Sequence, residues 1–134
     1  MRIMIVMKIN HVTYTVSDIS EAVLFYNKIF DCQPVAISKS LAYYDLDGLW
    51  FALNFEENPT ESYRHIAFDC DDLDVLKARF DRLDIVYTEG RKRHCDEKPS
   101  IYLKDPDGNL IEFHTGTLKD RITYYKKRKD ITIL

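Results

Sequence analysis

A repeated pattern constrains the fold of this chain more than any other feature of its sequence. The segment Asn10–Asp18 is echoed by Arg64–Asp72, and each copy has a histidine at its second position, continues through largely apolar residues and ends in an aspartate that can cap a helix. Copies of one structural unit place equivalent side chains in equivalent positions. We therefore expect His11 and His65 to occupy matching places in two related halves.

Each half carries the same order of predicted elements. Alternating apolar residues predict strands, and apolar residues at helical spacing predict one helix per half. In the first half these are a strand over 8–16, a helix ending at Phe30, and strands over 33–38, 41–46 and 49–55. In the second half they are a strand over 63–70, a helix over 71–83, and strands over 85–88, 100–103 and 109–114. Asp47-Gly48 and Asp107-Gly108 supply matching turns.

The pattern predicts an α+β fold built from two βαβββ modules. We expect one domain over 1–134, with module one at about 8–55, module two at about 63–114 and a C-terminal tail over 115–134. Two curved sheets of this kind can pair into an open trough that binds ligands on its concave side. The length suits a single domain with a real core.

Composition excludes several classes of function. The net charge of -3 and the local character of the basic clusters argue against nucleic acid as a partner. The apolar start, Met1–Met7, is too short to target or span a membrane. The three cysteines form no CxxC pair, which favours a reducing, cytoplasmic setting over a disulfide framework.

His11, His65 and Glu112 together suggest a metal site. Glu112 lies on an apolar strand, where a carboxylate needs a partner such as a cation. It follows Gly108 by four residues, and the counterpart four residues after Gly48 is Ala52, so the repeat supplies three protein ligands. Open coordination positions suit catalysis. Two core histidines and a surface glutamate are the alternative, but the equivalent placement favours the metal.

Basic and aromatic residues surround Glu112 in the sequence. Arg91 and Lys92 precede it in a loop, Ser100 and Tyr102 lie on the neighbouring strand, and Arg121 follows. Arginine is well matched to phosphonate, phosphate or carboxylate. Each residue alone is typical of solvated surface, and their convergence indicates a substrate with an anionic group.

The module arrangement resembles the vicinal oxygen chelate superfamily, which includes the glyoxalase and bleomycin-resistance proteins. Within it, longer stretches resemble the fosfomycin-resistance enzymes, and above all their metallothiol transferases from Gram-positive bacteria. The stretches are 41–44, 48–54, 62–68, 100–102, 105–108 and the tail 112–121 followed by Tyr124-Tyr125. Glu-Phe-His-Thr-Gly-Thr-Leu followed by Asp-Arg is the most discriminating of them.

The resemblance implies a metal-dependent thiol transferase that opens the epoxide of fosfomycin with a low-molecular-weight thiol, bacillithiol or cysteine. It implies Mn²⁺ or Mg²⁺ as the cofactor, with Zn²⁺ or Fe²⁺ also accepted by such ligands, and a homodimer with shared active sites. The metal ligands would be His11, His65 and Glu112, with no catalytic residue beyond the metal and substrate ligands. The substrate-binding residues would be Thr13, Tyr43, Trp50, Tyr63, Arg91, Lys92, Ser100, Tyr102 and Arg121.

Other activities remain as alternatives. A hydrolytic enzyme of this kind uses a carboxylate base where this chain has Leu41, and Thr13 resembles the glutathione-using branch. The same ligands could instead hold Fe(II) in a dioxygenase. A non-catalytic drug-binding protein is the alternative outside enzymes.

Overall fold

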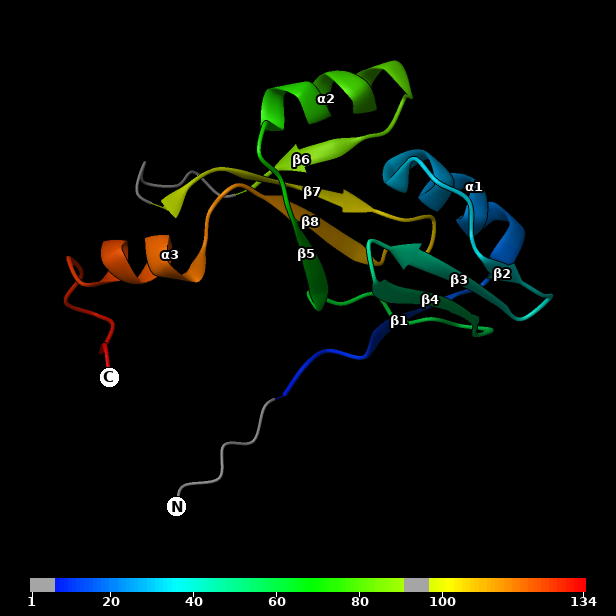
Figure 1. Cartoon of the computed structure of the whole chain (residues 1–134), viewed down its shortest axis with the longest axis horizontal. Coiled ribbons are helices and arrows are strands. Elements are labelled where there is room, and N and C mark those ends of the chain that lie inside the picture. Colours follow the sequence, from blue (N-terminus) through cyan, green and yellow to red (C-terminus); the bar gives the residue numbers. More distant parts are fainter. Residues whose placement is uncertain (1–6, 91–96) are drawn as a thin grey trace. The chain divides into compact units, whose positions relative to one another are not determined.

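The computed structural model describes residues 7–90 and 97–134. The chain divides into two compact units, Met1–Glu61 and Ser62–Leu134. Each unit has its own four-stranded sheet, and the colours of Figure 1 separate the blue and cyan first unit from the green to red second unit. The predicted α+β class with two βαβββ modules is confirmed.

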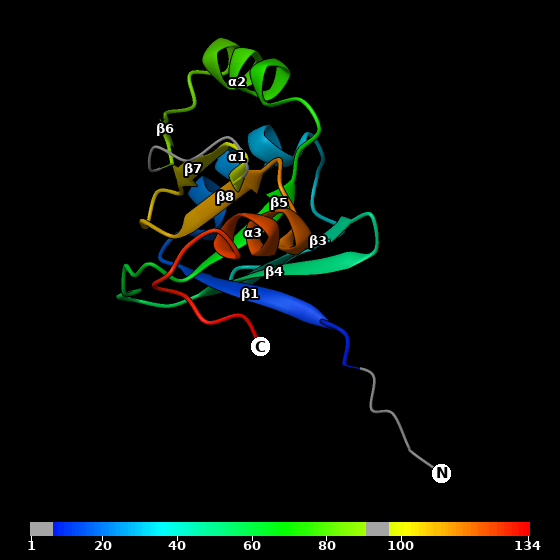
Figure 2. The same cartoon turned by 90° about the vertical axis from the view of Figure 1, so that its left-hand side faces the viewer.

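The first unit forms a mixed sheet with the strand order β1-β4-β3-β2. Its elements are β1 (His11–Val16), α1 (Ile19–Phe30), β2 (Ala36–Ile37), β3 (Leu41–Leu46) and β4 (Leu49–Phe55). β1 is parallel to β4, and the other pairs are antiparallel. Figure 2 shows β3, β4 and β1 side by side in that order.

The second unit repeats this topology as β5-β8-β7-β6. Its elements are β5 (His65–Asp69), α2 (Leu73–Arg82), β6 (Tyr87–Glu89), β7 (Ser100–Lys104), β8 (Leu110–His114) and α3 (Leu118–Tyr125). β5 is parallel to β8, whereas β7 pairs antiparallel with both β8 and β6. The third helix has no counterpart among the elements of the first unit.

Local chemistry explains where the helices begin and where the chain turns. Asp18 accepts a hydrogen bond from the backbone N–H of Glu21, and Asp72 does the same for Val75. Both satisfy donors that a helix start leaves open. The hairpin before β4 contains Gly48 at φ +92°, a left-handed conformation that favours glycine.

Aromatic packing fills the core between α1 and its sheet. Tyr26, Tyr44 and Phe51 are almost fully buried, and the ring of Phe30 lies 5.1 Å from that of Phe51. The hydroxyl of Tyr44 is hydrogen-bonded to the side-chain amide of Asn27 at 2.7 Å. Alternate residues of β3 and β4 therefore face the helix, and the residues between them face the opposite side of the sheet.

The strand registers establish how the two modules correspond. In the first module Thr13 pairs with Ala52, and Ala52 pairs with Tyr43. In the second module, Ala67, Glu112 and Tyr102 occupy the corresponding row. Ala52 therefore stands where the second module has Glu112, as the spacing after the paired glycines predicts.

Two element predictions need correction. The strand expected over 33–38 is reduced to β2, and at its start Pro34 has no N–H to donate to the ladder. α3 lies in the segment expected to be a tail, and its start has a capping box in which Thr117 and Asp120 exchange side-chain to backbone bonds. No helix among the described residues is long and apolar enough to cross a membrane.

We expect Asp105 to hold the turn that leads into β8. Its buried carboxylate accepts the backbone N–H groups of Asp107 and Asn109 and the side-chain amide of Asn109. Asp105→Ala should lower the free energy of unfolding by about 2 kcal/mol in urea titrations, because it leaves these donors without an acceptor. Asp105→Asn keeps an acceptor and should lose less than half as much; equal losses in both variants would contradict this role.

Candidate functional site

The best-defined part of the candidate site is a pair formed by His65 and Glu112. His65 Nε2 lies 3.1 Å from Glu112 Oε1. Glu112 is only 4% exposed although it carries a carboxylate, and it sits at the centre of β8 between Ile111 and Phe113, which are also buried. Burying a carboxylate is expensive unless a cation or several donors stabilise it.

The hydrogen bonding of His65 makes Nε2 the nitrogen that faces Glu112. Its Nδ1 lies 2.8 Å from the carbonyl oxygen of Tyr63, which only accepts, so Nδ1 carries the proton. In the neutral ring the lone pair of Nε2 then faces the Glu112 carboxylate, and either a proton or a metal ion can be shared by the two atoms. Metal-binding histidines are commonly fixed in this way by a backbone carbonyl.

The spacing of the pair also fits a metal. Two neighbouring ligand atoms, each about 2.1 Å from one ion, lie roughly 3 Å apart. The 3.1 Å between His65 Nε2 and Glu112 Oε1 has this value. One imidazole nitrogen and one carboxylate oxygen form a donor set that divalent Mn, Fe and Zn accept.

A hydrogen bond to Nδ1 also orients the ring of His11 in the first unit. Its Nδ1 lies 2.7 Å from the side-chain oxygen of Asn10, which leaves Nε2 as the atom able to bind a metal. Its ring lies 4.4 Å from the ring of Trp50, its partner in the β1–β4 register. Among the described residues of a single chain, no three metal-binding side chains gather into one cluster.

One face of the second sheet extends the pair into a row of polar residues. Glu112 and His114 share a face of β8, and they pair across to Tyr102 and Ser100 on β7. Residues two apart on a strand are separated by about 6.6 Å. Ser100 Oγ is buried and has no hydrogen-bond partner among the described residues, so this hydroxyl is available to a ligand.

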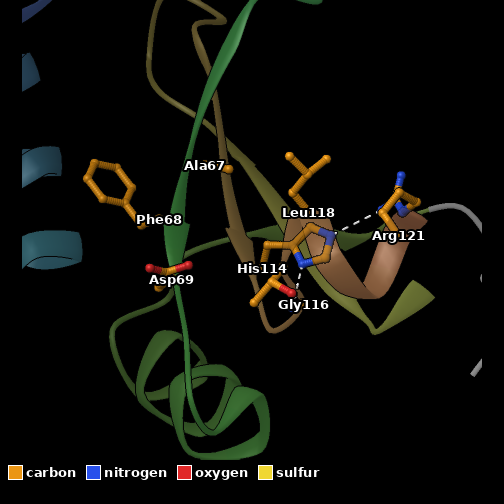
Figure 3. Close-up of a pocket in the computed structure, with 8 residues that line it drawn as sticks. Ala67, Phe68, Asp69, His114, Gly116, Leu118 and Arg121 are labelled. Atoms are coloured by element: carbon orange, nitrogen blue, oxygen red, sulfur yellow. Dashed lines mark hydrogen bonds between the residues drawn. The ribbon is translucent and has the colours of Figure 1, made fainter. Parts of the chain in front are cut away.

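Next to this row is a cavity of about 490 Å³ within the second unit. His114, Arg121 and the first turn of α3 line it, together with 67–69 of β5 (Figure 3). His114 Nδ1 accepts the backbone N–H of Gly116 at 2.7 Å, so the neutral ring carries its proton on Nε2. That nitrogen faces Arg121 Nη2 at 3.2 Å. Two donors that converge on one point suit an anionic oxygen accepting from both.

Three side chains position the guanidinium group of Arg121. Besides its contact with His114, its Nη1 donates to the hydroxyl of Tyr125 at 3.3 Å, and its Nε lies 3.7 Å from the buried carboxylate of Glu97. Its guanidinium also lies 5.7 Å from the centre of the Tyr125 ring. A side chain fixed in this way needs little further ordering when it binds a ligand.

The other predicted site residues fall into two groups, one in each unit. Tyr63 is exposed, and its hydroxyl lies 3.4 Å from that of Tyr102, beside His65. The residues on the corresponding face of the first sheet are Tyr43, Trp50, Thr13 and His11. Arg91 and Lys92 lie outside the described residues.

Comparison with known proteins agrees with this architecture. The model of the Glyoxalase/Bleomycin resistance protein/Dioxygenase superfamily matches residues 8–113. The chain belongs to this superfamily. Among its members, a metallothiol transferase FosB of Lysinibacillus sphaericus is 42% identical over 133 residues, covering 94% of each chain. A FosB of Bacillus licheniformis is 39% identical over 92% of this chain and 85% of its own.

Solved structures of the superfamily agree in fold. FosX, a fosfomycin resistance protein of Listeria monocytogenes crystallised with Mn(II) and sulfate, is 28% identical, with a TM-score of 0.78 over 90% of this chain and 99% of its own. FosX of Mesorhizobium loti is 29% identical, with a TM-score of 0.72 over 88% of this chain and 99% of its own.

Sequence reasoning missed two residues of the site within this superfamily fold. His114 follows Glu112 by two positions and therefore shares its strand face, which is a signal that periodicity could have supplied. Glu97 gave no such signal. Its approach to Arg121 joins the segment before β7 to α3, and no local pattern encodes that contact.

We expect Gly116→Ala to disturb His114. A methyl group at this position would lie 2.8 Å from His114 Cε1 and 2.9 Å from Lys98 Cβ. The substitution should lower the free energy of unfolding by about 1 to 3 kcal/mol in urea and shift the NMR signals of the His114 ring. Thr123→Ala, at an exposed position of α3, should stay within about 0.5 kcal/mol. Equal effects in the two variants would contradict the close contact.

Proposed function

We propose that this protein is a metal-dependent thiol transferase that opens the epoxide of fosfomycin by adding a low-molecular-weight thiol. The observation that carries the proposal is the His65–Glu112 pair, in which an imidazole nitrogen and a buried carboxylate oxygen lie at the separation of two ligands of one metal ion. The FosB relatives, named metallothiol transferases and about 40% identical over most of the chain, support the same activity.

His65, Glu112 and His11 would hold the divalent metal, with Mn²⁺ or Mg²⁺ as the expected ions. A bound divalent cation supplies Lewis-acid stabilisation of the negative charge that develops on the epoxide oxygen. Glu112 contributes a negative ligand from a buried position, and Tyr63 keeps His65 in the required tautomer through its carbonyl. Tyr43 and Trp50 would form apolar walls beside the reacting carbon.

Arg121, His114 and Ser100 would bind the phosphonate. Ser100 and His114 pair with each other about 6.6 Å along the strands from Glu112, and Arg121 Nη2 lies 3.2 Å from His114 Nε2. Tyr63 and Tyr102 would add hydroxyl contacts from the side of His65. Arg91 and Lys92, which lie outside the described residues, remain predicted contacts to the same group.

The thiol of the proposed reaction would come from a separate molecule, since neither of the two cysteines that the structure describes is suited to be the nucleophile; Cys95 lies outside the described residues. Burial raises the pKa of the Cys32 and Cys70 thiols, and the nearby carboxylate of Asp31 raises that of Cys32 further, so both stay protonated at neutral pH. In the reaction a C–S bond forms, a C–O bond of the epoxide breaks, and the oxygen is protonated to a hydroxyl. Bacillithiol or cysteine would supply the sulfur, in the cytoplasm where such thiols stay reduced.

Hydrolysis of the epoxide is the second candidate, favoured by the structural likeness to FosX. Against it, Leu41 stands on β3 where the hydrolytic enzymes have a carboxylate base. An aliphatic side chain cannot take a proton from water. Thiol addition does not need this base, because a thiolate is itself a strong nucleophile.

We expect formation of the thiol adduct to require both Mn²⁺ and a thiol, as measured by mass spectrometry of fosfomycin incubated with the purified protein. Glu112→Gln should lower adduct formation at least a hundredfold and weaken Mn²⁺ binding, since it removes a charged ligand. Glu89→Gln, which alters an exposed carboxylate in the same unit, should leave both unchanged. A diol formed without thiol would support hydrolysis instead, and full activity in Glu112→Gln would exclude this ligand assignment.

We further propose that the protein is a homodimer in which His11 of one subunit completes the site formed by His65 and Glu112 of the other. Mixing refolded His11→Ala and Glu112→Gln subunits tests this arrangement. The mixed dimer would then contain one site without substitutions, so activity should recover to about a quarter of the wild-type value, although each variant alone is inactive. No recovery in mixtures shown to contain heterodimers would place all three ligands on one chain.

A further inference from the structure

A second cavity, of about 330 Å³, lies within the first unit, and one of its lining residues, Trp50, has its ring 4.4 Å from that of His11. It is lined by Val35, Tyr43, Asp45, Gly48 and Trp50, together with Tyr44. This volume is at the lower end of the range for small-molecule sites, about 300–1,000 Å³. The cavity is separate from the one lined by His114 and Arg121, which belongs to the second unit.

The walls of this cavity combine two aromatic rings with one carboxylate. The rings of Tyr43 and Trp50 lie 5.2 Å apart, nearly edge to face, and Trp50 is 39% exposed. Aromatic faces attract ammonium groups, and a carboxylate adds a charged acceptor. The combination is suited to a primary ammonium group.

The carboxylate of Asp45 is already oriented by the backbone. Its Oδ1 accepts the N–H of Gly48 at 2.7 Å, and the hairpin that makes this possible depends on the positive φ of Gly48. The bond uses one carboxylate oxygen and leaves the lone pairs of Oδ2 for a ligand. The acceptor is thus placed before any ligand arrives.

Strand register connects the cavity to the proposed metal ligand. Asp45 pairs with Trp50, and Trp50 pairs with His11, so the three form one row across β3, β4 and β1. Neighbouring strands lie about 4.8 Å apart, which puts Asp45 roughly 10 Å from His11 along the row. In the second module the equivalent row ends in Lys104, which would repel a cation.

We propose that this cavity binds the ammonium group of an aminothiol co-substrate, with Asp45 as the charged acceptor and Tyr43 and Trp50 as the aromatic walls. The assignment rests on the proposed thiol transfer, whose expected thiols, bacillithiol and cysteine, both carry an amino group, and it adds the residues that would recognise that group. Thiols with a free amino group are selected over thiols that lack one. The sulfur end of the ligand is directed along the row toward His11.

Trp50 is the only tryptophan of the chain, so its fluorescence reports directly on the cavity. S-methylcysteamine carries an ammonium group and no reactive thiol. The thioether (methylthio)acetate carries a carboxylate in place of the ammonium group. We expect S-methylcysteamine to change the fluorescence of the wild-type protein in a saturable way, and (methylthio)acetate to bind much more weakly. Asp45→Asn should raise the Kd for S-methylcysteamine roughly tenfold. The asparagine oxygen can still accept from Gly48, which preserves the turn.

Asp47→Asn is the matched control, because Asp47 lies in the same hairpin but does not line the cavity. Its Kd for S-methylcysteamine should equal that of the wild type. Equal affinities in the wild type and Asp45→Asn, or no saturable response to S-methylcysteamine, would overturn the proposal.

A transferase assay separates this proposal from the proposed function. With fosfomycin and Mn²⁺, Asp45→Asn should lower kcat/KM for cysteamine roughly tenfold and leave that for mercaptoethanol unchanged. An equal loss with both thiols would overturn the role of Asp45 in thiol selection. If the wild-type protein forms no adduct with any thiol, the proposed function fails, and the fluorescence titration still decides whether the cavity binds ammonium groups.

Discussion

The charge of one buried side chain organises the candidate site. Glu112 lies in the middle of an apolar strand, and its carboxylate faces a histidine whose other nitrogen is tied to a carbonyl. Two acceptors at this distance repel unless a positive charge lies between them. A proton supplies that charge in the ion pair of the two side chains, and on the proposed assignment a divalent metal ion replaces it. The neighbouring polar groups are held by β7, β8 and α3.

The repeat allowed much of the fold to be predicted from the sequence. β3 and β4 begin and end at the expected residues, and the caps of α1 and α2 are the expected aspartates. These features depend on local patterns: alternation, a turn glycine at positive φ, and a side chain that can reach the first helical turn. α3 was missed although the Thr117 and Asp120 pair signals its start.

The candidate site was less predictable, because its geometry depends on contacts between distant segments. The sequence identified His65, Glu112 and Arg121 as candidates. It did not predict the tautomer that the Tyr63 carbonyl imposes on His65 or the contact between His114 and Arg121. The correspondence of Ala52 with Glu112 was predictable, since each follows a turn glycine by four residues and the turn sets the register of the hairpin. Contacts between side chains that are far apart in sequence follow no such local rule.

The correspondence between Asp45 in one module and Lys104 in the other has an evolutionary consequence. Duplicated modules start with the same residues, and each copy can then change alone. On the proposed assignments, one copy recognises the antibiotic through its anionic group and the other recognises the thiol through its cationic group. Such a protein can adapt to the thiol of a new host by substitutions in the first module, while the second module continues to bind the drug.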